Sequence, residues 1–149
     1  MVIGFTSVVG DLLHPGHLAM INESAEQCDI LIVGLVCDPT DRRSKNKPVE
    51  TVFERYYRLM SAKGVHSVVP LQGEQDLRLA LELLDYDIRF VGEEYKDQFF
   101  TGKDICERRG KQIIYNRRKH NLSSTTLRQR VAYAERTKDG TEEKAEDDE

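Results

Sequence analysis

The sequence predicts an α/β fold in which helices cover both faces of a parallel sheet. The first supporting observation is the continuous apolar run of residues 30–36, which is typical of a strand buried on both faces. The second is the alternation of strand-like and helix-like segments, which favours parallel strands joined by right-handed crossovers. The chain of 149 residues is long enough for one domain with one core.

The amino-terminal part predicts a strand, a helix and a second strand. The apolar run over residues 2–9 fits the first strand, and the apolar spacing of residues 18–27 fits one face of a helix. Residues 30–36 form the second strand. Residues 40–50 are polar and basic and are expected to form a loop.

Capping signals mark the middle of the chain. Thr51, followed three residues later by Glu54, predicts a capping box at the start of a helix over residues 51–63. Gly64 is placed to end that helix. A short strand is then expected over residues 65–70.

The carboxyl-terminal half continues the alternation. Helices are expected over residues 76–84 and 104–109, and strands over residues 88–91 and 112–115. Ser123 is placed to cap a final helix. The predicted sheet therefore has five strands.

The net charge of −4 arises at the end of the chain. Residues 137–149 contain seven acidic and two basic residues, which leaves 20 basic and 19 acidic residues in residues 1–136. The acidic segment has nothing apolar larger than Ala145 to bury, so it is expected to stay disordered beside a folded domain of residues 1–136.

The three cysteines, Cys28, Cys37 and Cys106, are widely spaced and form no CxxC pair. They support neither a disulfide framework nor a zinc site, and reduced thiols in the cytoplasm are the simplest expectation. No apolar run is long enough to span a membrane, and no secretory leader is visible. The basic residues lack interleaved aromatic residues, so nucleic-acid binding is not expected.

Two histidines stand at the turn between the first predicted strand and helix, in His14-Pro15-Gly16-His17. In open α/β sheets, ligands bind outside the carboxyl ends of the strands, and the start of a helix attracts anions. Two imidazoles three positions apart at such a turn suit phosphate chemistry. Alternatives are a pair of ordinary turn histidines or two ligands of a transition metal.

The segment from Asp11 to His17, DLLHPGH, resembles the HxGH signature of the nucleotidylyltransferase superfamily, in the form found in its glycerol-3-phosphate cytidylyltransferase branch. Residues 118–127 resemble the late RTEGISTT segment of that branch, with Arg118 on its arginine and residues 122–125 on its ISTT. The resemblance spans residues 2–131. It implies a Rossmann-like three-layer nucleotidylyltransferase fold with a five-stranded parallel sheet.

The resemblance implies transfer of CMP from CTP to a small phosphorylated polyol, with glycerol 3-phosphate as first choice and pyrophosphate as the leaving group. It assigns catalysis to His14, His17 and Arg118. The nucleotide- and phosphate-binding residues that it implies are Val9, Gly10, Asp11, Gly16, Gly92, Glu94, Leu122, Ser123, Ser124 and Thr125. The acceptor-binding residues that it implies are Asp38, Lys45, Lys47 and Arg55.

The resemblance further implies Mg²⁺ bound through the substrate phosphates rather than by protein side chains, and a homodimer. Two departures bear on the nucleobase. The branch has GTFD where this chain has residues 8–11, VVGD, and GDDW where this chain has residues 92–95, GEEY. An adenylyltransferase that uses ATP and acts on a sugar phosphate or on flavin mononucleotide therefore stays open. So does a catalytically weak nucleotide-binding regulator.

Overall fold

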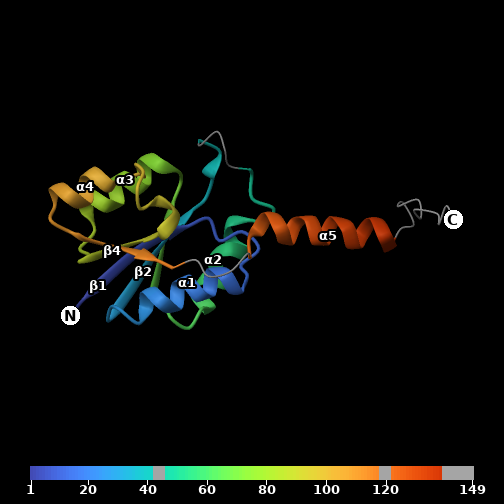
Figure 1. The fold of residues 1–149 in the computed structure, drawn as a ribbon, viewed down its shortest axis with the longest axis horizontal. Coiled ribbons are helices and arrows are strands. Elements are labelled where there is room, and N and C mark those ends of the chain that lie inside the picture. The colour runs from blue at the N-terminus through green and yellow to red at the C-terminus, as the bar shows by residue number, and fades with distance from the viewer. Residues whose placement is uncertain (42–45, 118–121, 139–149) are drawn as a thin grey trace.

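The computed structural model of the protein describes residues 1–41, 46–117 and 122–138. The described residues contain one sheet whose five strands are all parallel, in the order β3-β2-β1-β4-β5 (Figure 1). The strands are β1 (Ile3–Val8), β2 (Ile30–Val36), β3 (Ser67–Leu71), β4 (Ile88–Gly92) and β5 (Gln112–Asn116). This confirms the predicted five-stranded parallel sheet.

Two helices cover each face of the sheet (Figure 1). Helices α1 (Pro15–Ala25) and α2 (Val52–Ser61) lie on one face, where Ile21 and Leu59 pack with strand residues such as Leu31. Helices α3 (Glu74–Leu83) and α4 (Lys103–Arg108) lie on the other face, where their apolar residues pack with Phe5 of the central strand. The core is therefore divided into two layers by the sheet. The single-turn 3-10 helices η1 (Pro39–Asp41) and η2 (Glu93–Tyr95) follow β2 and β4.

Strand order fixes where a ligand can bind. The chain runs outward from β1 to β2 and β3, and then returns to place β4 on the other side of β1. The connections that leave β1 and β4 therefore diverge to opposite sides of the sheet. The crevice between their carboxyl ends is the switch point at which open α/β folds bind ligands.

Most element boundaries agree with the prediction to within two residues, and the start of α1 is the main exception. The helix begins at Pro15, three residues before the predicted range, because His14 caps it and proline suits the first helical position. The predicted capping box at Thr51 is confirmed, with the Thr51 Oγ1 accepting from the Glu54 amide at 3.2 Å. Helix α2 ends at Ser61, since the next residue, Ala62, is already extended.

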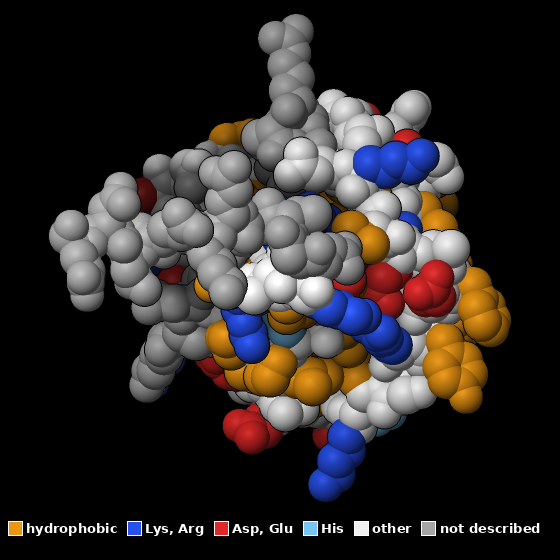
Figure 2. Space-filling view, turned by 90° about the vertical axis from the view of Figure 1, so that its right-hand side faces the viewer, with side chains coloured by type: hydrophobic (Ala, Val, Ile, Leu, Met, Phe, Trp, Pro, Cys, Tyr) orange, Lys and Arg blue, Asp and Glu red, His pale blue; other side chains and the backbone are white. Residues whose placement is uncertain are grey.

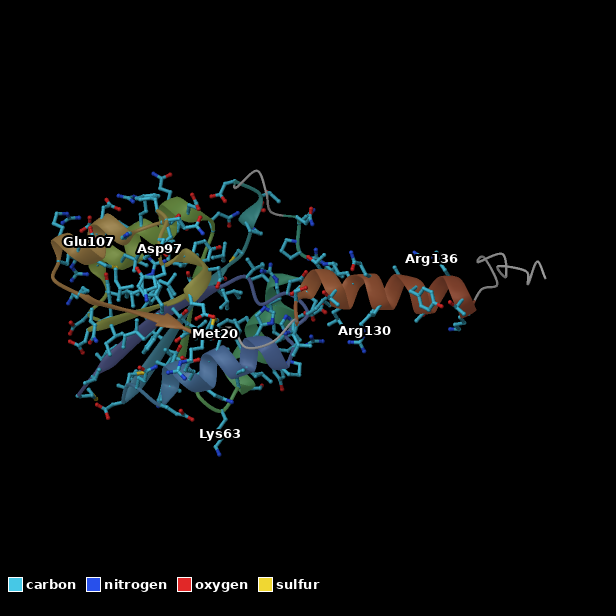
Figure 3. The ribbon with its side chains drawn as sticks, viewed as in Figure 1. Met20, Lys63, Asp97, Glu107, Arg130 and Arg136 are labelled. Atoms are coloured by element: carbon cyan, nitrogen blue, oxygen red, sulfur yellow. The ribbon has the colours of Figure 1, made fainter. Side chains whose placement is uncertain are left out.

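Helix α5 (Ser124–Lys138) differs from the other helices because none of its residues is buried. It points away from the body of the molecule (Figure 1), and Figure 3 shows Arg130 and Arg136 along its projecting part. The predicted cap is confirmed: the Ser123 Oγ accepts from the Thr126 amide at 3.0 Å. In the part of the chain that the structure describes, no helix is long and apolar enough to cross a membrane.

Candidate active site

A cavity of about 510 Å³ opens at the switch point. Its floor includes Val9 after β1 and Gly92 at the end of β4, and both were predicted to bind nucleotide. The residues predicted at the start of α5 also line it, namely Leu122, Ser123, Ser124 and Thr125. Segments more than 100 residues apart in sequence thus line a single cavity.

His14 and His17 line this cavity together with Gly16. The Nδ1 of His14 accepts from the Gly16 amide at 3.0 Å, and the Nδ1 of His17 accepts from the His14 amide at 3.2 Å. The two rings are tilted by 35° relative to one another, with their centroids 4.0 Å apart. A neutral imidazole whose Nδ1 accepts a hydrogen bond carries its proton on Nε2. Both rings are therefore held as Nε2 donors beside the helix start.

Asp11 connects the histidine turn to two other segments. Its side chain lines the cavity, and the residue is only 3% exposed. Its carboxylate accepts from the amides of Val49 and Glu50, at 3.0 and 2.9 Å, and forms an ion pair with Arg128 of α5. The Ser124 hydroxyl donates to the Asp11 carbonyl at 2.7 Å. Asp11 therefore fixes the loop before α2 and the start of α5 against the histidine turn.

The turn itself has an unusual backbone. Gly10 has a φ of +67°, which suits glycine, whereas Leu12 has a φ of +51°, which is rare for a residue with a side chain. The Leu12 amide donates to the carboxylate of Glu50 at 2.5 Å, and that buried carboxylate pairs with Arg58 at 3.0 Å. Strained backbone of this kind persists where its surroundings hold it. Gly10 is the one residue of the predicted nucleotide-binding set that does not line the cavity.

The sequence reasoning missed Glu50 and Arg128. The sequence could have indicated Arg128, since it follows Ser124 by one helical turn and shares its face of α5. No sequence pattern indicated Glu50, because its partners Leu12 and Arg58 are brought together by the fold.

Lowering the pH from about 5 to 2 is expected to destabilise the wild-type protein more than an Asp11→Asn variant. Burial alone would raise the pKa of Asp11, but the amides of Glu50 and Val49 and the Arg128 guanidinium together hold the pKa below its usual value. A carboxyl whose pKa is depressed in the folded state stabilises above its unfolded pKa. That contribution is lost as the pH falls through the folded pKa.

Urea unfolding of both proteins at a series of pH values would measure the effect. The difference in unfolding free energy should shrink on acidification. A difference that is constant, or that grows toward low pH, would contradict the depressed pKa.

The predicted acceptor-binding residues do not gather at the cavity as the predicted nucleotide-binding residues do. Lys45 and the predicted catalytic Arg118 lie outside the described residues. Lys47 is exposed and does not line the cavity, although its neighbour Asn46 does. Asp38 is also exposed. Its carboxylate accepts from the Thr40 hydroxyl and amide, and these bonds lower its pKa.

Arg55 is placed differently from its predicted role. It is 2% exposed and does not line the cavity. Its guanidinium donates to the backbone carbonyls of Val9, Glu50, Val36 and Cys37, at 2.7 to 3.2 Å. In this position the side chain ties together the segments that leave β1 and β2, and its nitrogens are engaged with the backbone rather than turned toward a substrate.

The remaining polar side chains of the cavity come from several elements. Glu94 of η2 lines it as predicted, and Arg117, just before the undescribed segment, lines it as well. Within the described ranges, no group of three or more His, Cys, Asp or Glu residues could hold a metal ion. The three cysteines are free thiols.

The family model and the curated relatives reported below place the chain in the HxGH nucleotidylyltransferase superfamily, a class of transferase enzymes, and the parallel sheet with an HxGH turn at its switch point fits this class. Within this superfamily the chain belongs to the cytidylyltransferase-like family, which matches residues 11–130. The sequence prediction of the superfamily and of its cytidylyltransferase-like branch is therefore confirmed.

Among curated relatives, glycerol-3-phosphate cytidylyltransferase of Staphylococcus aureus is 30% identical over 121 residues, which are 81% of this chain and 88% of that protein. The bifunctional protein HldE of Mesorhizobium japonicum is 34% identical over 115 residues, which are 75% of this chain. The chain spans only about a quarter of the HldE relatives, 23% in this case.

Solved structures show the same fold. The lipopolysaccharide core biosynthesis protein of Thermoplasma volcanium superposes with a TM-score of 0.64 at 23% identity, over 82% of this chain and 99% of that one. Pantothenate synthetase of Thermus thermophilus superposes with a TM-score of 0.59 at 16% identity, over 94% of this chain and 71% of that one.

Proposed function

We propose that the protein transfers CMP from CTP to a small phosphorylated polyol, with glycerol 3-phosphate as first choice, and releases pyrophosphate. The observation that carries this proposal is the meeting of His14 and His17, both held as Nε2 donors, with the start of α5 in one cavity. Such donors can stabilise negative charge as it develops on a phosphoryl group.

In the proposed reaction, a phosphate oxygen of the acceptor attacks the α-phosphorus of the nucleotide. A new P–O bond forms as the bond to the bridging oxygen breaks, and that electron pair leaves with pyrophosphate. The attacking oxygen is already anionic, so the protein has mainly to position the groups and neutralise charge. His14 and His17 donate to the α-phosphate and the bridging oxygen. Ser123–Thr125 at the start of α5 hold the leaving pyrophosphate, as helix starts commonly hold anions.

The proposal includes a magnesium ion held by the substrate phosphates. Asp11, the carboxylate beside the histidine turn, is already engaged by two amides and by Arg128. Mg²⁺ commonly keeps several waters and binds through phosphates, and there it would neutralise their charge. We expect no further ligand from the described side chains.

The relative from Staphylococcus aureus supports the choice of substrate, since its similarity covers most of both chains. The second candidate is adenylyl transfer from ATP to a sugar phosphate. It is favoured by residues 92–95, which depart from the branch's GDDW next to the expected base, and by relatives named HldE that match at similar identity. Free thiols at all three cysteines support action in the cytoplasm.

Pyrophosphate release measured for each of four nucleoside triphosphates against a panel of phosphorylated alcohols should give the highest kcat/KM for CTP with glycerol 3-phosphate. If ATP exceeded CTP by tenfold or more, about 1.4 kcal/mol of transition-state binding, the adenylyl alternative would replace the cytidylyl one. If no triphosphate bound or reacted, the transferase proposal itself would fail.

We also propose that the protein is a homodimer that uses the outer face of α2. The family resemblance implied a homodimer, and α2 carries apolar side chains on its outer face, although its Leu59 is fully buried in the core. The most exposed apolar side chains of α2 are Phe53 and Tyr57, at 71% and 64% exposure, with their rings 6.0 Å apart. Figure 2 shows hydrophobic side chains at the surface also on the end toward which α5 points. Grouped apolar surface of this kind marks association sites.

Light scattering at working concentration should therefore give about twice the chain mass of 17.1 kDa. A Phe53→Asp, Tyr57→Asp double variant should give the single mass. The matched control is Leu83→Asp, which changes an apolar side chain of similar exposure, 73%, on α3 at the opposite face. A monomeric wild type, or a control that dissociates equally, would contradict this interface.

A further inference from the structure

Arg89 is a buried arginine that the proposed reaction has not used. It is the second residue of β4, is 4% exposed and lines the cavity. Its Nη1 donates to the Thr101 carbonyl, whereas its Nε is buried without a hydrogen-bond partner. Among the described residues, no carboxylate forms an ion pair with it. Burial of a cation without a carboxylate is costly.

Two other arginines show how this fold treats guanidinium groups that it uses structurally. Arg55 donates to four backbone carbonyls. Arg109 lies 5.4 Å over the Tyr86 ring and donates to the carbonyls of Leu81 and Leu84. Neither of them lines the cavity. Arg89 alone of the three combines a cavity position with an unpartnered nitrogen, which is the arrangement of a side chain prepared for an anion.

The segment before α4 holds Arg89 in place. The guanidinium lies 5.3 Å over the Phe100 ring, and that ring meets Tyr95 and Tyr115 edge to face, at 6.3 and 6.2 Å. Gly102 has a φ of +83°, and a Cβ there would lie only 2.8 Å from the Arg89 Nη1. The segment therefore closes tightly over the arginine, and the aromatic side chains restrict its movement.

Hydroxyl-binding groups lie beside Arg89. The Thr101 Oγ1 donates to the Glu74 carboxylate at 2.8 Å, and both residues line the cavity. The remaining lone pairs of the carboxylate and of the hydroxyl oxygen can accept hydrogen bonds from the hydroxyls of a polyol. Charge, hydroxyl-binding groups and an aromatic wall thus occur together at the α3 side of the cavity.

The in-line geometry of the reaction indicates which part of the cavity binds the acceptor. In phosphoryl transfer the attacking and leaving oxygens lie roughly in line on opposite sides of the phosphorus. The leaving pyrophosphate is proposed to lie at the start of α5, so the acceptor has to approach from elsewhere in the same cavity. The Arg89 region is lined by Glu74 of α3 and by Phe100 and Thr101 of the segment before α4, which contact Arg89 or one another.

We propose that Arg89 binds the phosphate of the acceptor, and that Glu74 and Thr101 bind its hydroxyl groups. The inference rests on the proposed function, because it presupposes an acceptor phosphate that attacks the nucleotide. A guanidinium offers paired N–H donors that match two oxygens of one phosphate. Arg89 then does the work that the sequence assigned to Arg55.

The first test compares Arg89→Met with Arg109→Met in steady-state pyrophosphate release from CTP and glycerol 3-phosphate. Arg89→Met should raise the KM for glycerol 3-phosphate on the order of 10- to 100-fold, the loss expected for hydrogen bonds to a charged group. The KM for CTP should stay unchanged. Arg89→Lys should fall between wild type and Arg89→Met. Arg109→Met should lower the melting temperature without changing the KM for glycerol 3-phosphate.

The second test does not depend on whether a variant folds. Wild-type protein labelled with ¹⁵N is saturated with the α,β-methylene analogue of CTP, and inorganic phosphate and then glycerol 3-phosphate are added. The assigned Nε–H signal of Arg89 should shift with both additions, and that of Arg109 should not.

Each outcome separates the two proposals. Turnover with an unshifted Arg89 signal and an unchanged KM in Arg89→Met would overturn the acceptor site while the transferase function stands. Absence of turnover with every triphosphate would overturn the transferase function, and Arg89 would then be a phosphate-binding residue only if its signal still shifted.

Discussion

A His17→Ala variant is expected to lose about 10²–10³ in kcat while it keeps its fold. His17 lines the cavity, and its Nδ1 is occupied by the His14 amide, which holds the Nε2 proton as a donor for the phosphate. The loss corresponds to removal of one preorganised donor to transition-state charge. Removal of the capping contact itself should cost at most about 1 kcal/mol of stability. His14→Ala should behave in the same way.

The control is His66→Ala. The Nδ1 of His66 also accepts a backbone amide, from Leu31 at 3.1 Å, but His66 lies outside the cavity. His17→Ala and His66→Ala therefore both remove an imidazole that accepts from a backbone amide, but only His17→Ala removes a hydrogen-bond donor at the cavity. Single-turnover rates and melting temperatures would be measured for both. A His17→Ala rate within threefold of wild type would remove the catalytic role.

An Arg55→Met variant is expected to lose about 3–5 kcal/mol of unfolding free energy. The substitution leaves carbonyls of Val9, Val36 and Cys37 without their donor at a buried position. Urea unfolding would measure the change. The protein that remains folded should show an unchanged KM for the acceptor, because Arg55 does not line the cavity.

Arg78→Met provides the comparison for this result. Arg78 pairs with Asp104 at 3.0 Å on the exposed surface, where solvent screening leaves such a pair contributing little to stability. If Arg55→Met were as stable as Arg78→Met and raised the KM for the acceptor, the role predicted from sequence would be restored.

Local patterns account for what could be predicted. The histidine turn was placed correctly because an apolar strand precedes it and helical spacing follows it. The start of α5 was placed correctly because Ser123 carries a capping signal that acts within one turn. Both segments line the cavity because parallel strands deliver their carboxyl ends to one edge of the sheet.

Contacts between distant segments could not be predicted. Arg55 was expected to bind the acceptor, but its burial depends on carbonyls of Val9 and Val36, which lie 46 and 19 residues away. Asp11 binds Val49 and Glu50, 38 and 39 residues on. Arg89 is a charged residue inside an otherwise apolar strand, which could have marked it as a candidate site residue. The sequence prediction used this segment only to assign a strand.

Helix α5 is fastened at one end only. Its first turns are attached to Asp11 through Ser124 and Arg128, no residue of the helix is buried, and the part beyond Arg128 has no such attachment among the described contacts. Amide hydrogen exchange along α5 should therefore be graded, with slow exchange next to the cavity and progressively faster exchange toward Lys138. The end of α5 that lines the cavity is thus expected to be locally more stable than the end that lies in solvent. Fraying at the outer end can proceed without disturbing the cavity until it reaches Arg128.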